Sequence, residues 1–143
     1  MSAADDRNFV AAFRDTTLPA SAFHHRDHVR MAWLYVREHG PVEAAPRFAA
    51  DLQAFARAKG VPGLYHATIT GAYIALIAER QRDTPADTWD AFAAAHADLL
   101  AWKPGVLDRY YSAERLWSDA ARAQFLLPDR LAVAVDSERR GGA

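Results

Sequence analysis

Apolar side chains recur along the chain at the three- and four-residue spacing that gives an α-helix one buried face. Phe9 and Phe13 follow this spacing near the N-terminus, and Phe48, Leu52 and Phe55 repeat it further along. Proline and glycine separate such stretches, and long alternating β-branched runs are absent. Alanine, the strongest helix former, occurs 32 times. The pattern therefore predicts an all-α protein.

Five main helices are predicted between the breaks, followed by shorter C-terminal helices. The main helices span residues 3–14, 22–38, 42–59, 64–82 and 85–102, and the short ones span 106–111 and 119–127. Gly40 and Pro41 end the second helix, since glycine and then proline are common just beyond a helix C-terminus. Short connections favour antiparallel neighbours. We therefore expect a single-domain helical bundle over residues 1–136, with a flexible tail at 137–143.

Composition narrows the range of functions. A chain of 143 residues with 51% hydrophobic content and a net charge of −1 is typical of one globular domain. A pI of about 6.6 argues against a dedicated nucleic-acid-binding protein, and no apolar run is long enough to span a membrane. The chain has no cysteine and does not begin with a signal-like segment. These features predict a cytoplasmic protein with neither a nucleic-acid nor a membrane partner.

Histidines fall on the apolar faces of three predicted helices. At about 100° per residue, His24, His25 and His28 point to one side of the second helix, opposite to its arginines. His66 shares the apolar face of the fourth helix, and His96 shares that of the fifth. Each unpaired buried polar group costs about 1–3 kcal/mol. Up to five imidazoles meeting in the interior would therefore indicate a metal ion, a bound ligand or a water-filled cavity.

A metal centre is one interpretation of these histidines. His25, His28 and His66 are the predicted ligands, with His24 as the alternative to His25 and His96 as a further candidate. Side chains three or four residues apart on a helix can reach the same ion. Nitrogen ligation favours a divalent transition metal such as Zn²⁺, Fe²⁺, Cu²⁺ or Ni²⁺, and no organic cofactor is indicated.

Polar neighbours of the histidines complete the predicted site. Asp27 is placed to hydrogen-bond a ligand imidazole. The side chains expected to contact a substrate are Tyr35, Thr70, Tyr73 and Tyr110. An alternative for Tyr110 and the adjacent Tyr111 is an aromatic plug flanked by helix N-caps at Ser112 and Ser118.

The sequence leaves three functions open. The first is a metal-dependent enzyme acting on a small organic molecule, and the second is a metal-free module that binds a small ligand in a pocket lined by histidine and tyrosine. The third is a structural protein that acts through Trp33. The helical phase of Trp33 places it on the arginine-bearing side of its helix, and an exposed tryptophan often marks a contact surface. Trp33 therefore predicts a homodimer contact.

Three segments carry a resemblance to other proteins: FHHRDHV at residues 23–29, YHATIT at 65–70 and YYS at 110–112. Together they resemble a family of small bacterial all-helical proteins of uncharacterised activity, over roughly residues 20–130, and this resemblance implies no reaction. A looser fold-level resemblance is to the DinB/YfiT-like bundles, whose helices hold a three-histidine metal centre. In this chain the close histidines come early and the lone one comes later, the reverse of the usual order in that family.

Overall fold

The computed structural model describes residues 2–102 and 105–130, and all regular elements in these residues are helical. The all-α class is confirmed. The α-helices are α1 (Ala3–Arg14), α2 (His25–Ala58), α3 (Ala67–Asp83), α4 (Trp89–Ala95), α5 (Ala113–Leu116) and α6 (Asp119–Ala123). Short 3₁₀ turns join them: η1 (Ala20–Ala22), η2 (Pro62–Leu64), η3 (Ala97–Leu100) and η4 (Val106–Arg109). No helix in the described residues is long and apolar enough to cross a membrane.

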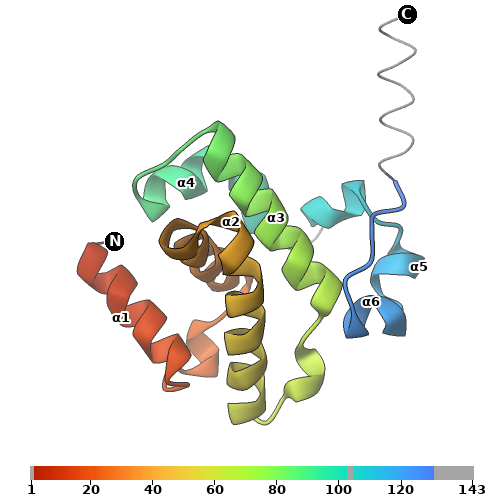
Figure 1. Ribbon diagram of the computed structural model, residues 1–143, viewed down its shortest axis with the longest axis horizontal. Coiled ribbons are helices and arrows are strands. Elements are labelled where there is room, and N and C mark those ends of the chain that lie inside the picture. Colours follow the sequence, from red (N-terminus) through yellow and green to blue (C-terminus); the bar gives the residue numbers. More distant parts are fainter. Residues whose placement is uncertain (1, 103–104, 131–143) are drawn as a thin grey trace, which may run out of the picture.

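Helix α1 packs along one side of α2 (Figure 1). It begins with a reciprocal cap, in which the Ser2 hydroxyl accepts the Asp5 N–H at 3.1 Å and the Asp5 carboxylate accepts the Ser2 N–H at 3.1 Å. Phe13 is fully buried and contacts the rings of Phe23 and Phe55 at centroid distances of 5.1 and 5.3 Å. This aromatic cluster ties α1 to α2 and to the segment that precedes α2.

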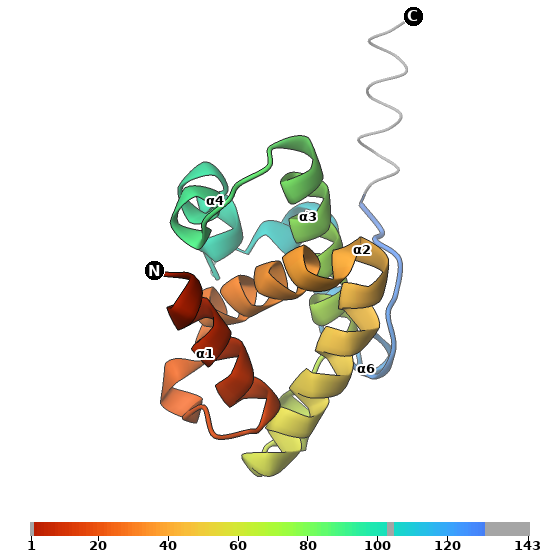
Figure 2. The ribbon, with the colours of Figure 1, turned by 60° about the vertical axis from the view of Figure 1, so that its left-hand side comes forward.

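Helix α2 consists of two arms that meet at Gly40, and the bend is visible in Figure 2. Gly40 has φ 81° and ψ 167°, a backbone conformation that is almost exclusive to glycine. The predicted break after residue 38 is therefore present, with the second arm starting directly after the glycine. The bend matters for function because the two arms form adjoining walls of a cavity.

Replacement of Gly40 by alanine is expected to lower the free energy of unfolding by about 2 kcal/mol, because its φ and ψ strain any residue with a Cβ atom. A Cβ at this position would meet no atom within 4 Å, so the whole effect comes from the backbone. Gly63→Ala is the matched control, since a Cβ there is equally free and its φ lies outside the left-handed region. Urea unfolding should show a change for Gly63→Ala within about 0.5 kcal/mol. An equal response of the two variants would contradict the strain at Gly40.

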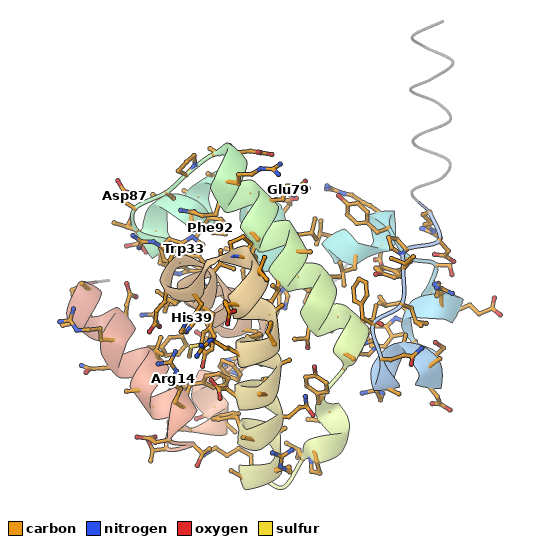
Figure 3. All side chains as sticks on the ribbon, viewed as in Figure 1. Arg14, Trp33, His39, Glu79, Asp87 and Phe92 are labelled. Carbon is orange, nitrogen blue, oxygen red and sulfur yellow. The ribbon has the colours of Figure 1, made fainter. Side chains whose placement is uncertain are left out.

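The predicted exposure of Trp33 is wrong. Trp33 has no exposed surface, and its indole N–H donates to the Gln81 side-chain oxygen at 3.0 Å. Its ring packs on Trp89 and Phe92 with centroids 5.9 and 5.7 Å away. Figure 3 shows Trp33 and Phe92 turned inward between α2 and α4. A buried Trp33 cannot form a contact surface, so the structure does not support a homodimer through this face.

The arginine-bearing side of α2 is covered because other elements pack against it. Arg30 is buried and pairs with Asp6 of α1 at 2.8 Å, with its guanidinium 4.1 Å from the centroid of the Phe9 ring. Arg37 lies over the Trp33 ring and donates to the Asp87 carbonyl at 2.9 Å. The arginines of this helix therefore lie at packing contacts as well as on the solvent-exposed surface.

The C-terminal segments pack against α3, as Figure 1 shows for α6. The Thr68 hydroxyl donates to the Gln124 carbonyl at 2.9 Å and accepts the Leu126 N–H at 3.1 Å. Tyr111 is buried and donates to the Leu126 carbonyl at 2.7 Å, in agreement with the predicted plug. The expected domain boundary at residue 136 and the tail at 137–143 lie outside the described residues.

Candidate functional site

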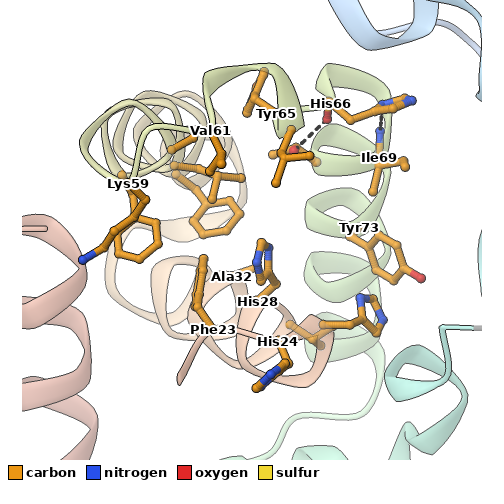
Figure 4. A pocket seen from close by; sticks show the side chains of 18 of the residues that line it. Phe23, His24, His28, Ala32, Lys59, Val61, Tyr65, His66, Ile69 and Tyr73 are labelled. Carbon is orange, nitrogen blue, oxygen red and sulfur yellow. Dashed lines mark hydrogen bonds between the residues drawn. The ribbon is translucent and has the colours of Figure 1, made fainter. Parts of the chain in front are cut away.

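A cavity of about 590 Å³ lies between the two arms of α2 and the start of α3 (Figure 4). Most of its lining is apolar: Ala20, Phe23, Val29, Ala32, Phe48, Leu52, Phe55, Ala56, Val61, Leu64, Ile69, Trp102 and Trp117. The polar lining residues are His24, His25, His28, Lys59, Tyr65, His66, Thr70, Tyr73 and Arg122. Four of the five histidines that were expected to face the interior therefore line one cavity.

His28 projects into this cavity from the first turns of α2 (Figure 4). Its imidazole stacks on the Phe23 ring with centroids 3.9 Å apart and planes inclined by 23°. Burial, together with the nearby His25 imidazole, lowers the pKa of His28 to about 4. His28 is therefore neutral at pH 7, with one ring nitrogen that donates and one that accepts.

His25 has a defined tautomer. Its Nε2 lies 2.9 Å from the Leu99 carbonyl oxygen, which can only accept, so Nε2 carries the proton. Burial lowers the pKa of His25, and in the neutral ring Nδ1 keeps a lone pair. The ring contacts Tyr73 and Trp102 at centroid distances of 5.1 and 5.0 Å. Nδ1 is therefore a hydrogen-bond acceptor on a cavity-lining side chain.

His66 is the N-cap of α3 and uses both of its ring nitrogens within the fold. Nδ1 accepts the Ile69 N–H at 3.1 Å, and Nε2–H donates to the Leu116 carbonyl at 2.7 Å. Burial lowers the pKa of His66, and the carbonyl and N–H contacts define the same neutral tautomer. Neither nitrogen is free to bind a metal in this arrangement.

The predicted three-histidine centre is not assembled in the described residues, where no group of three His, Cys, Asp or Glu side chains could hold a metal ion. The helical phases assigned to His24 and His66 do not apply, because both residues are N-caps that precede their helices. The His24 side chain is 77% exposed. The Asp27 carboxylate accepts the His24 N–H at 3.0 Å, so it caps α2 and does not orient a ligand imidazole.

Two of the four predicted substrate contacts, Thr70 and Tyr73, line the cavity, and Tyr35 and Tyr110 do not. Tyr35 is fully buried and donates to the Asp51 carboxylate at 2.6 Å, a hydrogen bond that joins the two arms of α2. Tyr110 packs against the core.

His96 is buried at the C-terminal end of α4, away from the cavity lining. Its Nδ1 lies 3.3 Å from Arg80, which pairs bidentately with Asp98 at 2.9 and 2.8 Å. This arrangement agrees with a structural role for His96.

Sequence reasoning did not identify the walls of the cavity. Phe48, Leu52 and Phe55 have the spacing of ordinary core residues, and nothing in that spacing shows that one side of them faces a hollow. Trp102 and Trp117 carry a weak signal, since each is a tryptophan next to a helix break. Lys59 and Arg122 also line the cavity, which has no carboxylate among its described lining residues.

Comparison of the chain with models of known protein families, with curated proteins and with solved structures finds no match. The resemblance carried by residues 23–29, 65–70 and 110–112 stays a prediction.

Proposed function

We propose that the protein binds a small, predominantly apolar molecule in the cavity between the arms of α2, without a metal ion. The observation that carries this proposal is the neutral His28 imidazole within an apolar cavity of about 590 Å³. Ligand sites commonly enclose about 300–1,000 Å³ and combine apolar walls with a few polar groups that orient the ligand. The cavity has both properties.

The ligand gains most of its binding free energy from the aromatic and aliphatic walls. Phe23, Phe48 and Phe55 are each at least nine-tenths buried, so they are held by the core and do not need to be ordered by the ligand. A preformed wall of this kind favours a flat or branched apolar molecule over a flexible polar one.

Hydrogen bonding to the imidazoles gives the ligand its orientation. His25 offers the Nδ1 lone pair, because its Nε2–H is held by Leu99. The N–H of His28 is held by a hydrogen bond to the Phe23 backbone, so a neutral His28 offers its second ring nitrogen as an acceptor. A hydroxyl group matches these nitrogens, since both accept a hydrogen bond and a hydroxyl can donate to either of them. The expected ligand is therefore an apolar molecule bearing a hydroxyl.

Charge excludes one class of ligand from this cavity. Lys59 and Arg122 both line it, and neither forms an ion pair within the described residues. With two cations and no carboxylate in the described lining, a cationic ligand would be repelled. The ligand is neutral or anionic.

Binding of 8-anilinonaphthalene-1-sulfonate, an apolar anion, is the first test. Its fluorescence should rise with the folded wild-type protein, and Ala32→Phe should weaken binding at least about tenfold, because Ala32 is a buried part of the cavity wall. Ala75→Phe is the matched control, since Ala75 is exposed on α3. Urea unfolding confirms that both variants fold. Equal binding by the two variants would contradict the proposal.

The role of His28 is tested with a pair of probes that differ in one hydroxyl. His28→Phe should weaken the binding of 1-naphthol by about tenfold, the value of a hydrogen bond to a buried partner, and should leave naphthalene binding within about twofold. Metal analysis of the untagged protein tests separately whether the site holds a metal ion. Stoichiometric zinc, iron, copper or nickel that is lost in both His28→Ala and His66→Ala would overturn the metal-free proposal in favour of a metal-dependent enzyme.

A further inference from the structure

A second hollow of about 590 Å³ lies beside the first, between α3 and the segment that carries η4 and α5. The two hollows share Ile69, Tyr73, Trp102 and Trp117 as a partition. The second one is also lined by Gly105, Leu107, Asp108 and Leu116, which do not contribute to the first. The two hollows therefore differ in the residues that line them.

Two tryptophans form perpendicular walls of this second hollow. The ring centroids of Trp102 and Trp117 are 6.4 Å apart, and their planes are inclined by 84°. Trp102 is 43% exposed and Trp117 is 54% exposed, whereas Trp33 and Trp89 are at most 2% exposed. Trp102 and Trp117 are thus not core residues, and their exposed faces are available to a ligand.

Tyr73 adds a third aromatic side chain and an unused hydroxyl. Its side chain is buried, and the hydroxyl has no hydrogen-bond partner in the described structure. The hydroxyl points away from His28 in Figure 4 and would lie 3.7 Å from a Cβ atom at Gly105, so it is next to the second hollow. Burial, with the charges of Asp108 and Asp98 adding to it, raises the pKa of Tyr73 to about 12. The hydroxyl is therefore protonated and free to donate.

The charge of the second hollow is opposite to that of the first. Asp108 is the one charged residue among its described lining residues, and its carboxylate forms no ion pair within the described part of the chain. A carboxylate beside three aromatic side chains favours a cation, because the face of each ring is the negative end of its quadrupole.

We propose that the second hollow binds a small molecule with a methylated ammonium group, packed against the exposed surfaces of Trp102 and Trp117 and facing Asp108. A quaternary ammonium fits this lining better than a primary one, since it is weakly hydrated and makes no N–H hydrogen bonds that the aromatic walls would leave unpaired. An oxygen close to the ammonium would accept the hydrogen bond that Tyr73 can donate. Choline has both groups and serves as the probe.

The decisive comparison is between choline and 3,3-dimethyl-1-butanol, which has the same shape without the charge. Tryptophan fluorescence follows both titrations, because Trp102 and Trp117 line the hollow. Choline should bind the wild-type protein at least about tenfold more tightly, the effect of a cation over aromatic faces. Equal binding of the two compounds, or no binding of choline, would overturn the proposal.

Three variants test which side chains contribute to choline binding. Asp108→Asn should weaken choline binding at least about threefold and leave the alcohol unchanged, and Trp117→Leu should weaken choline at least about tenfold. Glu114→Gln is the control, because it removes an equal charge from an exposed side chain that does not line the hollow. Unchanged choline binding in Asp108→Asn would contradict the assignment. Ala32→Phe should retain choline binding, so this test fails or succeeds independently of the first cavity.

Discussion

Trp33→Ala is expected to lower the free energy of unfolding by about 4 kcal/mol, within the range for removing a buried tryptophan. The side chain is fully buried and packs on the rings of Trp89 and Phe92, which hold α4 against α2. Its loss also removes the indole N–H that Gln81 accepts. Urea unfolding followed by far-UV circular dichroism measures the change.

The control for Trp33→Ala is Trp117→Ala, at a side chain that is 54% exposed. It should change the free energy of unfolding by less than about 1 kcal/mol. Sedimentation distinguishes the interpretation of Trp33 as a contact surface from its role in the core. A Trp33→Ala protein that is as stable as the wild type but loses self-association would contradict the buried position.

Acidification is expected to destabilise the protein through its buried imidazoles. The pKa of His28 is about 4 in the folded protein, against an ordinary value near 6.5, so the unfolded chain binds a proton that the folded chain excludes. The contribution of this group is therefore complete above about pH 6.5 and is lost as the pH falls toward 4. Between pH 7.5 and pH 4.5 it amounts to about 2–3 kcal/mol. Burial also lowers the pKa values of His25, His66 and His96, which act in the same direction.

Urea unfolding at pH 7.5 and pH 4.5 measures this effect, and His28→Gln isolates the part due to one residue. The difference in unfolding free energy between the two pH values should shrink by about 2–3 kcal/mol in this variant. His24→Gln is the control, because the His24 side chain is 77% exposed and should leave the difference unchanged. An unchanged difference in His28→Gln would show that His28 is accessible to protons in the folded state.

Most helix starts were predictable to within a few residues because local signals define them. The predicted helix at 85–102 is wrong in length, since α4 ends at Ala95 and the 3₁₀ turn η3 follows it, and α5 was not predicted. The helix at 3–14 matches α1, and Gly40 and Gly60 stand where the arms of α2 end. The start of the second helix was placed three residues too early, and so was that of the fourth. Those small errors mattered, since they turned His24 and His66 from capping residues into apparent members of a helical face.

The candidate site was only partly predictable. His25, His28, Thr70 and Tyr73 do line one cavity, since each lies within a regular helix whose inward face the periodicity identifies. Tyr35 shares that face but donates to Asp51, because the bend at Gly40 brings the second arm of α2 over it. No local pattern contains this information.

The sequence alone determined the helical class, the breaks between helices and the inward direction of the first turns of α2. These properties depend on residues within one or two turns of each other, where 3.6-residue periodicity and backbone preferences act. Tertiary structure decided that Trp33 is buried, that both ring nitrogens of His66 form hydrogen bonds with the backbone and that aromatic side chains line a cavity. Each of these outcomes depends on partners distant in the sequence, which periodicity along a single helix cannot specify.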